Sequence, residues 1–245
     1  MKDQYFGDIN DYRKYGLLRT IASAVDGPLL VGWMLTPDDG TTDGGRRAYL
    51  DRPQVRRHFD PVLFDGLAKL LREAPRPSVR LIESSGLLPR ARFHSEIVPD
   101  SKREREHWTA GLLTAARGAD LVFVDPDNGI EVPSAPIGRK GSSKYVTWDE
   151  LQSLWQLGSS LLIYQHFPRR PREAFARELV HQLRERTGAK LIEAFHTSHV
   201  LFLLAAQPRH ETNLHAACET LTSRWHGEIS PIGFRGPRPP MLGLV

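Results

Sequence analysis

The sequence predicts an α/β fold in which a mostly parallel sheet ends in an antiparallel hairpin and carries helices on both faces. Short apolar runs alternate with amphipathic stretches along the chain, which favours parallel strands joined by right-handed crossovers. The last two apolar runs are only a few residues apart, so we expect them to pair antiparallel. No repeat or linker divides the 245 residues, and we treat 1–245 as a single α/β domain.

The strands are expected where about five Val, Ile, Leu or Phe residues are bounded by polar turns, a pattern typical of strands covered on both faces. These runs are 29–35, 79–83, 120–124, 160–164, 190–195 and 199–206.

The helices are expected in the amphipathic stretches between these runs. Asp60 is placed to cap a helix with Pro61 at its first position, and Gly188 is placed to end another. The predicted helices cover residues near 60–73, 102–117, 148–157, 171–187 and 209–224.

Composition excludes several classes of protein. Hydrophobic residues make up 40% and charged residues 25%, which is typical of globular proteins and not of disordered ones. We expect no contact with a membrane, because no run approaches the roughly 18–20 apolar residues of a membrane helix. Cys218 is the only cysteine, which rules out an intrachain disulfide and a cysteine zinc cluster. The N-terminus does not resemble a signal peptide, so we expect a cytoplasmic protein.

The sharpest motif is Asp125-Pro126-Asp127-Asn128-Gly129, directly after the apolar run 120–124. Ligands of open α/β sheets bind beyond the carboxyl ends of strands. Asp, Pro, Asn and Gly are also ordinary turn residues. With Glu131, however, three carboxylates fall within seven residues, more than a turn requires. The sequence therefore favours a functional site here.

Two further features are placed to join that site. Gly138 to Tyr145 combines glycines, hydroxyls, Arg139, Lys140 and Lys144, which suits either a phosphate or a mobile surface loop. The run at 160–164 leads into Gln165 and His166, and His166 would titrate near neutral pH. If these two strands are neighbours, His166 lies beside Asp125, although a lone histidine there is more often structural.

Both ends of the chain carry unusual segments. Residues 1–28 begin with aromatics, carboxylates and Lys14, and we expect this segment to fold back on the site. Residues 225–245 are rich in Gly, Pro and Arg towards the end, and we expect an extended arm there.

These motifs resemble those of the RlmJ-type methyltransferases, which methylate an adenine N6 of large-subunit ribosomal RNA. That family opens with the pattern G-N-x-x-D-x-x-K-H-x-x-L and later has Asp-Pro-Pro-Tyr/Phe after a strand. At the same spacing this chain has Gly7, Asp8, Asp11, Lys14, Tyr15 and Leu18, and later Asp125, Pro126, Asp127 and Asn128. The small-residue turn of the family corresponds to 35–41, and its next strand end corresponds to 164–168.

The resemblance implies a Rossmann-like class I methyltransferase-type sheet and S-adenosylmethionine (SAM) as cofactor. It implies that Asp125 positions the acceptor amine of a nucleic acid or nucleotide-like substrate, with SAM near Lys14 and Tyr15. Glu83, at the end of the second predicted strand, would hold the ribose of the cofactor. The candidate catalytic residues are Asp125, Asp127, Asn128, His166 and Lys14; the candidate cofactor-binding residues are Lys14, Tyr15, Thr36, Asp38, Gly40, Glu83 and Asp125.

Two alternatives stay open. Asp125, Asp127 and Glu131, with Asp38 and Asp39, are suited to hold Mg²⁺ in a metal-dependent nuclease or phosphodiesterase. The other alternative is a non-catalytic methyltransferase-fold protein that binds a partner in the cleft that holds cofactor and substrate in a methyltransferase.

Nucleic acid is the expected partner, because arginines and lysines cluster along the chain, although the net charge is only +4. A solvated arginine-rich surface would give the same pattern. The clusters are Arg46, Arg47, Arg52, Arg56 and Arg57; Arg139, Lys140 and Lys144; Arg169, Arg170 and Arg172; and Arg235 and Arg238.

Overall fold

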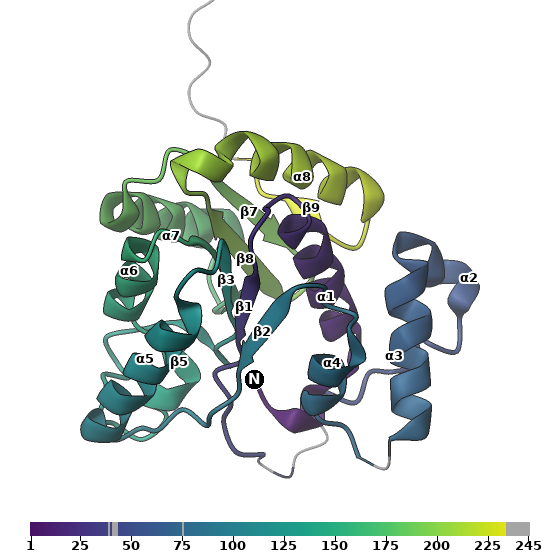
Figure 1. Cartoon of the computed structure of the whole chain (residues 1–245), viewed down its shortest axis with the longest axis horizontal. Coiled ribbons are helices and arrows are strands. Elements are labelled where there is room, and N and C mark those ends of the chain that lie inside the picture. The colour runs from purple at the N-terminus through teal and green to yellow at the C-terminus, as the bar shows by residue number, and fades with distance from the viewer. Residues whose placement is uncertain (39, 41–43, 75, 234–245) are drawn as a thin grey trace, which may run out of the picture.

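The computed structural model describes residues 1–38, 40, 44–74 and 76–233. Within them, a seven-stranded sheet has the spatial order β2-β1-β3-β6-β8-β7-β9 (Figure 1). A separate parallel pair joins β4 (Gly129–Ile130) to β5 (Tyr145–Val146). The strands of the main sheet are β1 (Leu29–Gly32), β2 (Ala91–His94), β3 (Leu121–Val124), β6 (Ser160–His166), β7 (Ile192–His196), β8 (Val200–Ala205) and β9 (Ser230–Pro231).

The strand directions give a class I methyltransferase-type sheet. β2, β1, β3 and β6 are parallel, and β8 runs antiparallel between β6 and β7. The predicted fold class and the C-terminal hairpin are therefore confirmed. The chain first winds from β1 to β2 and then returns to place β3 on the other side of β1. The switch point of the sheet, where open α/β folds bind ligands, thus lies between the carboxyl ends of β1 and β3.

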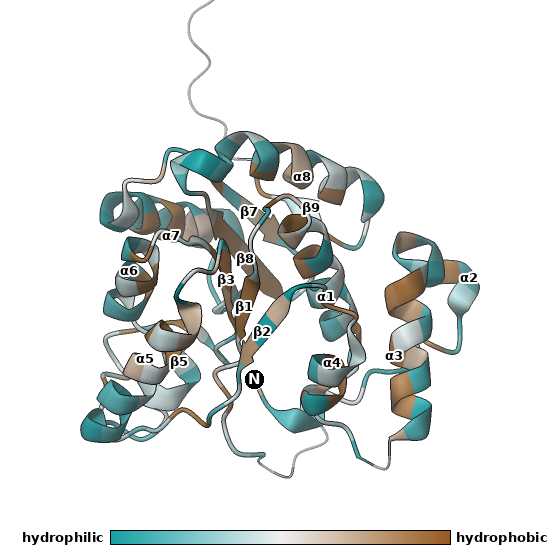
Figure 2. Ribbon diagram, viewed as in Figure 1, coloured by the Kyte–Doolittle hydropathy of each residue, from teal (hydrophilic) through white to brown (hydrophobic). Residues whose placement is uncertain are grey.

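Helices cover both faces of the sheet, whose ribbon is the most apolar part of the molecule (Figure 2). One face packs on α1 (Ile9–Ala22), α3 (Pro61–Glu73), α4 (Arg80–Ser85) and α8 (Glu211–Arg224). The other packs on α5 (Lys102–Ala116), α6 (Trp148–Gln156) and α7 (Arg172–Thr187). The short helix α2 (Pro53–Arg56) precedes α3. As expected, the Asp60 side chain caps α3, with Pro61 at its first position, and Gly188 ends α7 at a φ of 70°.

The first and last helices pack directly against each other. Asp8 caps α1 by accepting a hydrogen bond from the Asn10 N–H at 2.8 Å. The Arg13 guanidinium on α1 pairs with Glu228 just beyond α8, with Nε 2.7 Å from Oε2. Trp225 is fully buried and lies so close to Gly16 that a Cβ there would be 1.9 Å from its ring. Only glycine permits this approach of the two helices.

The strand predicted at 79–83 is wrong, because residues 80–83 belong to α4, Val79 directly precedes that helix, and the β2 strand lies at Ala91–His94 instead. Val79 and Ile82 are buried three residues apart, which is helical spacing, and Gly86 ends the helix at a φ of 70°. Strand β2 was missed because, as an edge strand, it carries the polar side chains Arg92 and His94 among its four residues.

The C-terminal region is packed on the sheet over part of the segment expected as an arm. Trp225 is buried, and β9 pairs with β7 through Ser230 and Pro231. Residues 234–245 lie outside the described residues. None of the described helices combines the length and the apolarity that crossing a bilayer requires.

Candidate functional site

The turn after β3 is fixed by a side chain from the neighbouring strand. The Gln165 carbonyl oxygen accepts a hydrogen bond from the Ile130 N–H at 2.8 Å, and its amide donates to the Asn128 carbonyl at 3.2 Å. Gly129 has a φ of 125°, and a Cβ on it would lie 2.3 Å from the Gln165 amide. β3 and β6 are paired, which confirms that the strands carrying Asp125 and His166 are neighbours. Gln165 therefore holds the turn through both ends of its side-chain amide.

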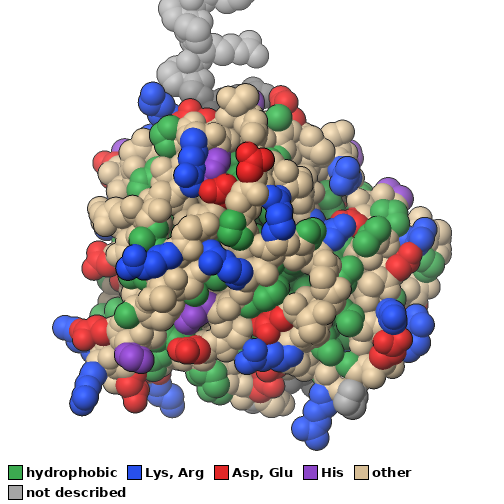
Figure 3. Space-filling view, viewed as in Figure 1, with side chains coloured by type: hydrophobic (Ala, Val, Ile, Leu, Met, Phe, Trp, Pro, Cys, Tyr) green, Lys and Arg blue, Asp and Glu red, His purple; other side chains and the backbone are tan. Residues whose placement is uncertain are grey.

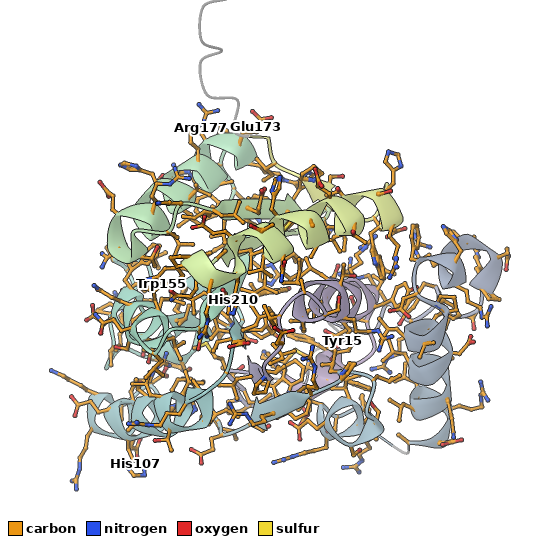
Figure 4. The ribbon with its side chains drawn as sticks, turned by 45° about the horizontal axis from the view of Figure 1, so that its top comes forward. Tyr15, His107, Trp155, Glu173, Arg177 and His210 are labelled. Carbon is orange, nitrogen blue, oxygen red and sulfur yellow. The ribbon has the colours of Figure 1, made fainter. Side chains whose placement is uncertain are left out.

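A buried ionic cluster lies below this turn. Lys14 Nζ is 2.7 Å from Asp125 Oδ2 and 2.9 Å from Asp11 Oδ1, and all three side chains are at most 4% exposed. The Tyr15 hydroxyl donates to the other oxygen of Asp11 at 3.2 Å. Figure 4 shows Tyr15 in the interior, whereas Glu173 and Arg177 project from the surface of α7.

The pKa values of this cluster favour a charged lysine. Burial lowers the pKa of Lys14, but the Asp11 and Asp125 carboxylates outweigh it, so the pKa is raised. Burial raises the pKa of Asp11 despite the attraction of Lys14. Burial also raises the pKa of Tyr15, which keeps its phenol protonated. Asp125 is thus engaged with a cation and is 2% exposed.

The crevice between the carboxyl ends of β1 and β3, where the sequence resemblance places SAM, is bridged by the start of the chain. Trp33 and Met34 follow β1 and are fully buried. The amino nitrogen of Met1 donates to the Met34 carbonyl at 3.2 Å and to the Asp125 carbonyl at 3.0 Å. The Thr36 N–H donates to the Met1 carbonyl at 2.9 Å. Met1 therefore lies between these two strand ends, where the resemblance places SAM.

The other residues expected at the cofactor are dispersed. The Thr36 hydroxyl donates a hydrogen bond to Asp127. Asp38 is exposed, and its carboxylate accepts a hydrogen bond from the Gln4 N–H. A Cβ on Gly40 would have no neighbour within 4 Å. Asp39 lies outside the described residues. Glu83 does not end a strand: in α4 its carboxylate accepts from the Trp33 indole N–H at 2.9 Å and from the Ser95 hydroxyl. It therefore fixes Trp33, whose ring packs on Tyr15 of α1 and Phe93 of β2.

A cavity of about 660 Å³ lies beside the bridged crevice, over the carboxyl ends of β3 and β6. We call it the first cavity. It brings together residues from the N-terminal segment, the start of α1, the loop before α2 and the ends of both strands. Its lining residues are Lys2, Tyr5, Asp8, Asn10, Asp11, Gly44, Gly45, Arg46, Asp127, Asn128, Lys144, Tyr164 and His166.

The first cavity holds groups that bind anions and groups that transfer protons. Burial lowers the pKa of His166, which favours a neutral imidazole at pH 7, and its Nε2 lies 3.3 Å from the Tyr164 hydroxyl. Burial would raise the pKa of Asp127, but the Met1 amino group, 2.6 Å away, and the Thr36 hydroxyl outweigh it and lower it. Arg46 is more than half exposed while its Nε lies 3.3 Å from Asp8.

The loop at 138–144 is held by Asp100, which the sequence did not single out. The Asp100 carboxylate accepts from the Gly141 N–H at 2.8 Å and the Ser143 N–H at 2.6 Å. Burial would raise the pKa of Asp100, and these backbone donors outweigh it and lower it. The Lys144 carbonyl in turn accepts from the Asn128 N–H at 2.9 Å, which brings this loop to the site.

The carboxylates expected to hold Mg²⁺ serve separate partners. Asp125 binds Lys14, Asp127 binds Thr36, and the Glu131 carboxylate accepts from the Trp148 N–H at 2.7 Å. Among the described residues, no group of three or more His, Cys, Asp or Glu side chains is arranged to hold a metal ion. Asp125, Asp127 and Glu131 therefore do not form the shared ligand set that the alternative requires.

Asp8, Asn10 and Arg46 also line the first cavity without having been proposed as site residues. Asp8 had a signal, because it falls in the N-terminal family pattern. Arg46 had only its place in a basic cluster, shared with Arg56 and Arg57, which instead pair with Glu228 and Asp65. Figure 3 shows basic and acidic side chains interspersed on the face in view. Of the basic clusters named from the sequence, Arg46 and Lys144 line the first cavity.

Comparison with known proteins adds little beyond the fold. No family model matches the chain, and no curated protein matches it. A similar solved structure is human methyltransferase-like protein 13 in complex with S-adenosylhomocysteine (SAH), at 13% identity and a TM-score of 0.35. The match covers 92% of this chain and 93% of that one. The fold class rests on the strand order of the sheet itself.

Proposed function

We propose that this protein binds a nucleotide-like ligand in the first cavity, as a methyltransferase-fold protein whose SAM crevice is bridged by Met1. The observation that carries the proposal is the position of this cavity at the carboxyl ends of β3 and β6, beside the switch point. A volume of about 660 Å³ falls within the range of small-molecule sites, which is roughly 300–1,000 Å³.

The lining suits the two halves of a nucleotide. Arg46 and Lys144 supply cationic donors for a phosphate, and Arg in particular binds phosphate through paired N–H groups. Tyr5 and Tyr164 supply rings for a base, and Asn128 supplies an amide. His166 is neutral at pH 7, so it is suited to accept a proton from a bound ligand.

Methyl transfer from SAM to a nucleic acid is the second candidate function, favoured by the strand order of the sheet. In this candidate Asp125 positions the acceptor amine, as the resemblance to the adenine methyltransferases implies. It requires Met1 to leave the crevice, because its amino group now bridges the Met34 and Asp125 carbonyls.

Calorimetric titration separates the two candidates. We would titrate the protein with adenosine 5′-monophosphate (AMP), SAM and SAH, each with Mg²⁺ and with EDTA. AMP is the probe because the resemblance implies an adenine ligand. We expect AMP to bind and SAM to show no heat. Metal-independent SAM binding in the micromolar range would replace the first candidate with the second.

Matched variants locate the binding. Lys144→Ala removes a cation of the first cavity and should weaken AMP binding several-fold. Lys190→Ala removes another exposed cation, which precedes the start of β7 and does not line the first cavity. This control should leave AMP binding unchanged. Equal loss in both variants, or AMP binding that neither variant changes, would contradict the assignment of this cavity.

A further inference from the structure

A second cavity of about 660 Å³ lies on the other side of Asn128 and His166, which line both cavities. We propose that this second cavity is a subsite for a nucleobase, so that the ligand is a single-stranded nucleic acid spanning both cavities and not a mononucleotide. The proposal rests on the proposed function, because it assigns the neighbouring nucleotide of the same strand to the second cavity.

The second cavity is lined by planar side chains. Tyr145, Trp148, Phe167 and Phe175 all contribute to it, and the rings of Phe167 and Phe175 meet edge to face at 6.3 Å between centroids. Stacking on aromatic rings is how proteins hold the splayed bases of single-stranded nucleic acids. The first cavity, in contrast, is lined mainly by polar and charged groups.

Arginines lie at these aromatic rings. The Arg170 guanidinium is 5.4 Å from the centre of the Phe175 ring, and the Arg172 guanidinium is 5.0 Å from that of Phe167. Both arginines are exposed; Arg170 pairs with Glu178, so Arg172 supplies the uncompensated positive charge beside the aromatic surface, where a sugar–phosphate backbone would pass. This charge favours a nucleic acid over an apolar peptide as occupant.

The acidic residues of the second cavity already have partners. Glu178 pairs with Arg170 at 2.7 Å, and Glu131 accepts from the Trp148 N–H at 2.7 Å. Arg170 therefore balances the charge of Glu178, and the Glu131 carboxylate is directed to the start of α6. Gln182 lines the same cavity and bears an amide, a group that binds the polar edge of a base.

The wall between the two cavities is rigid. The His166 N–H donates to the Asn128 carbonyl at 3.0 Å, and Gln165 ties the same turn to β6. Gly129 cannot carry a side chain there because Gln165 fills the space. The spacing of the cavities is therefore fixed by the fold, as a ligand with two bases at a regular interval requires.

The experiment compares a mononucleotide with a short strand. AMP, a single-stranded oligoadenylate and the same strand with abasic positions are titrated into the protein and into Phe175→Leu, which keeps an apolar side chain but removes the ring. Loss of one stacked base should weaken oligoadenylate binding by about 5- to 100-fold. AMP binding should not change, because Phe175 lines only the second cavity. The abasic strand should bind both proteins alike.

Each outcome decides the proposal. If AMP binds and the strand binds no tighter, or if Phe175→Leu leaves strand binding unchanged, the second subsite is wrong and the proposed function stands. If neither AMP nor the strand binds, the proposed function itself fails. If a proline- and aromatic-rich peptide binds instead and is weakened by Phe175→Leu, the occupant is a peptide. Trp155→Phe, altered at the far end of α6, controls for a general loss of aromatic packing.

Discussion

Lys14 and Asp125, 111 residues apart in the sequence, form a buried ion pair in which Nζ lies 2.7 Å from Oδ2. Asp125 follows β3 and Lys14 lies on α1, so the pair ties the first helix to the centre of the sheet. It also determines what Asp125 is able to do, since a carboxylate bound to a buried lysine is not free to meet a ligand without exchanging its partner.

We expect Lys14→Met to destabilise the protein by about 3–5 kcal/mol, because it leaves Asp11 and Asp125 buried without their cation. Denaturant unfolding followed by circular dichroism measures this loss. Lys69→Met, on the exposed side of α3, is the matched control and should change stability by less than about 0.5 kcal/mol. If Lys14→Met lowered the free energy of unfolding as little as Lys69→Met does, the prediction would be wrong, and the two carboxylates would be hydrated without the lysine.

Gly129→Ala should cost more stability than Gly138→Ala. Both glycines have a positive φ, of 125° and 95°, so both substitutions carry backbone strain of about 1–3 kcal/mol. Only Gly129 has a neighbour in the way, with Gln165 2.3 Å from the new Cβ, whereas Gly138 has none within 4 Å. Melting temperatures of the two variants test this, and equal shifts would mean that Gln165 moves aside freely.

Stability should fall as the pH drops below about 6.5, and His94 should account for part of the fall. His94 is 7% exposed, and neither of its ring nitrogens has a hydrogen-bond partner among the described residues. Burial lowers the pKa of His94 and outweighs Glu96, which raises it. Between the ordinary pKa and the lowered one the unfolded chain binds more protons than the folded chain, so acid favours unfolding.

Free energies of unfolding at pH 7.5 and pH 5.5 provide the measurement. The difference between the two values should be smaller in His94→Leu than in the unmodified protein. His107→Leu, changed at a side chain that projects from α5 (Figure 4), should keep the full difference. An unchanged difference in His94→Leu would assign the pH dependence to other groups, such as His166 and His210, whose pKa values burial also lowers.

Gly16→Ala should destabilise the protein even though alanine is favoured over glycine in a helix by about 1 kcal/mol. The new methyl group would lie 1.9 Å from the Trp225 ring, so α1 and α8 would have to separate. In a Trp225→Leu background the same substitution should become neutral or stabilising. A thermodynamic cycle of the two changes measures this coupling, and additive effects would contradict it.

The sequence predicted the elements whose pattern is local. The strands β3 and β6 and the hairpin of β7 and β8 followed from apolar runs, and α3, α5, α6, α7 and α8 followed from amphipathic spacing and caps. The prediction failed at 79–83, where Val79, Leu81 and Ile82 are apolar, as in a short strand. The buried residues are Val79 and Ile82, whose spacing of three is that of one face of a helix. An edge strand such as β2 has no comparable apolar run.

The sequence predicted only the part of the site that lies at the ends of two neighbouring strands. Asp127 and His166 meet at the first cavity because β3 and β6 are adjacent and parallel. The pairing of Lys14 with Asp125 and the position of Met1 between Met34 and Asp125 depend on contacts between distant parts of the chain. No local pattern encodes such contacts, so they had to come from the structure.

The packing of α1 on α8 has a consequence for how the chain acquires its shape during synthesis. Arg13 and Glu228 are separated by 215 residues, and the Trp225 ring, which packs on Tyr12 and on Gly16, lies at the same end of the chain as Glu228. On the ribosome the first helix therefore emerges long before the surface that covers it. Until translation is nearly complete, the part of α1 that Trp225 covers stays available to chaperones or to other nascent chains. Truncation shortly before Trp225 should consequently yield an aggregating product and not a smaller folded one.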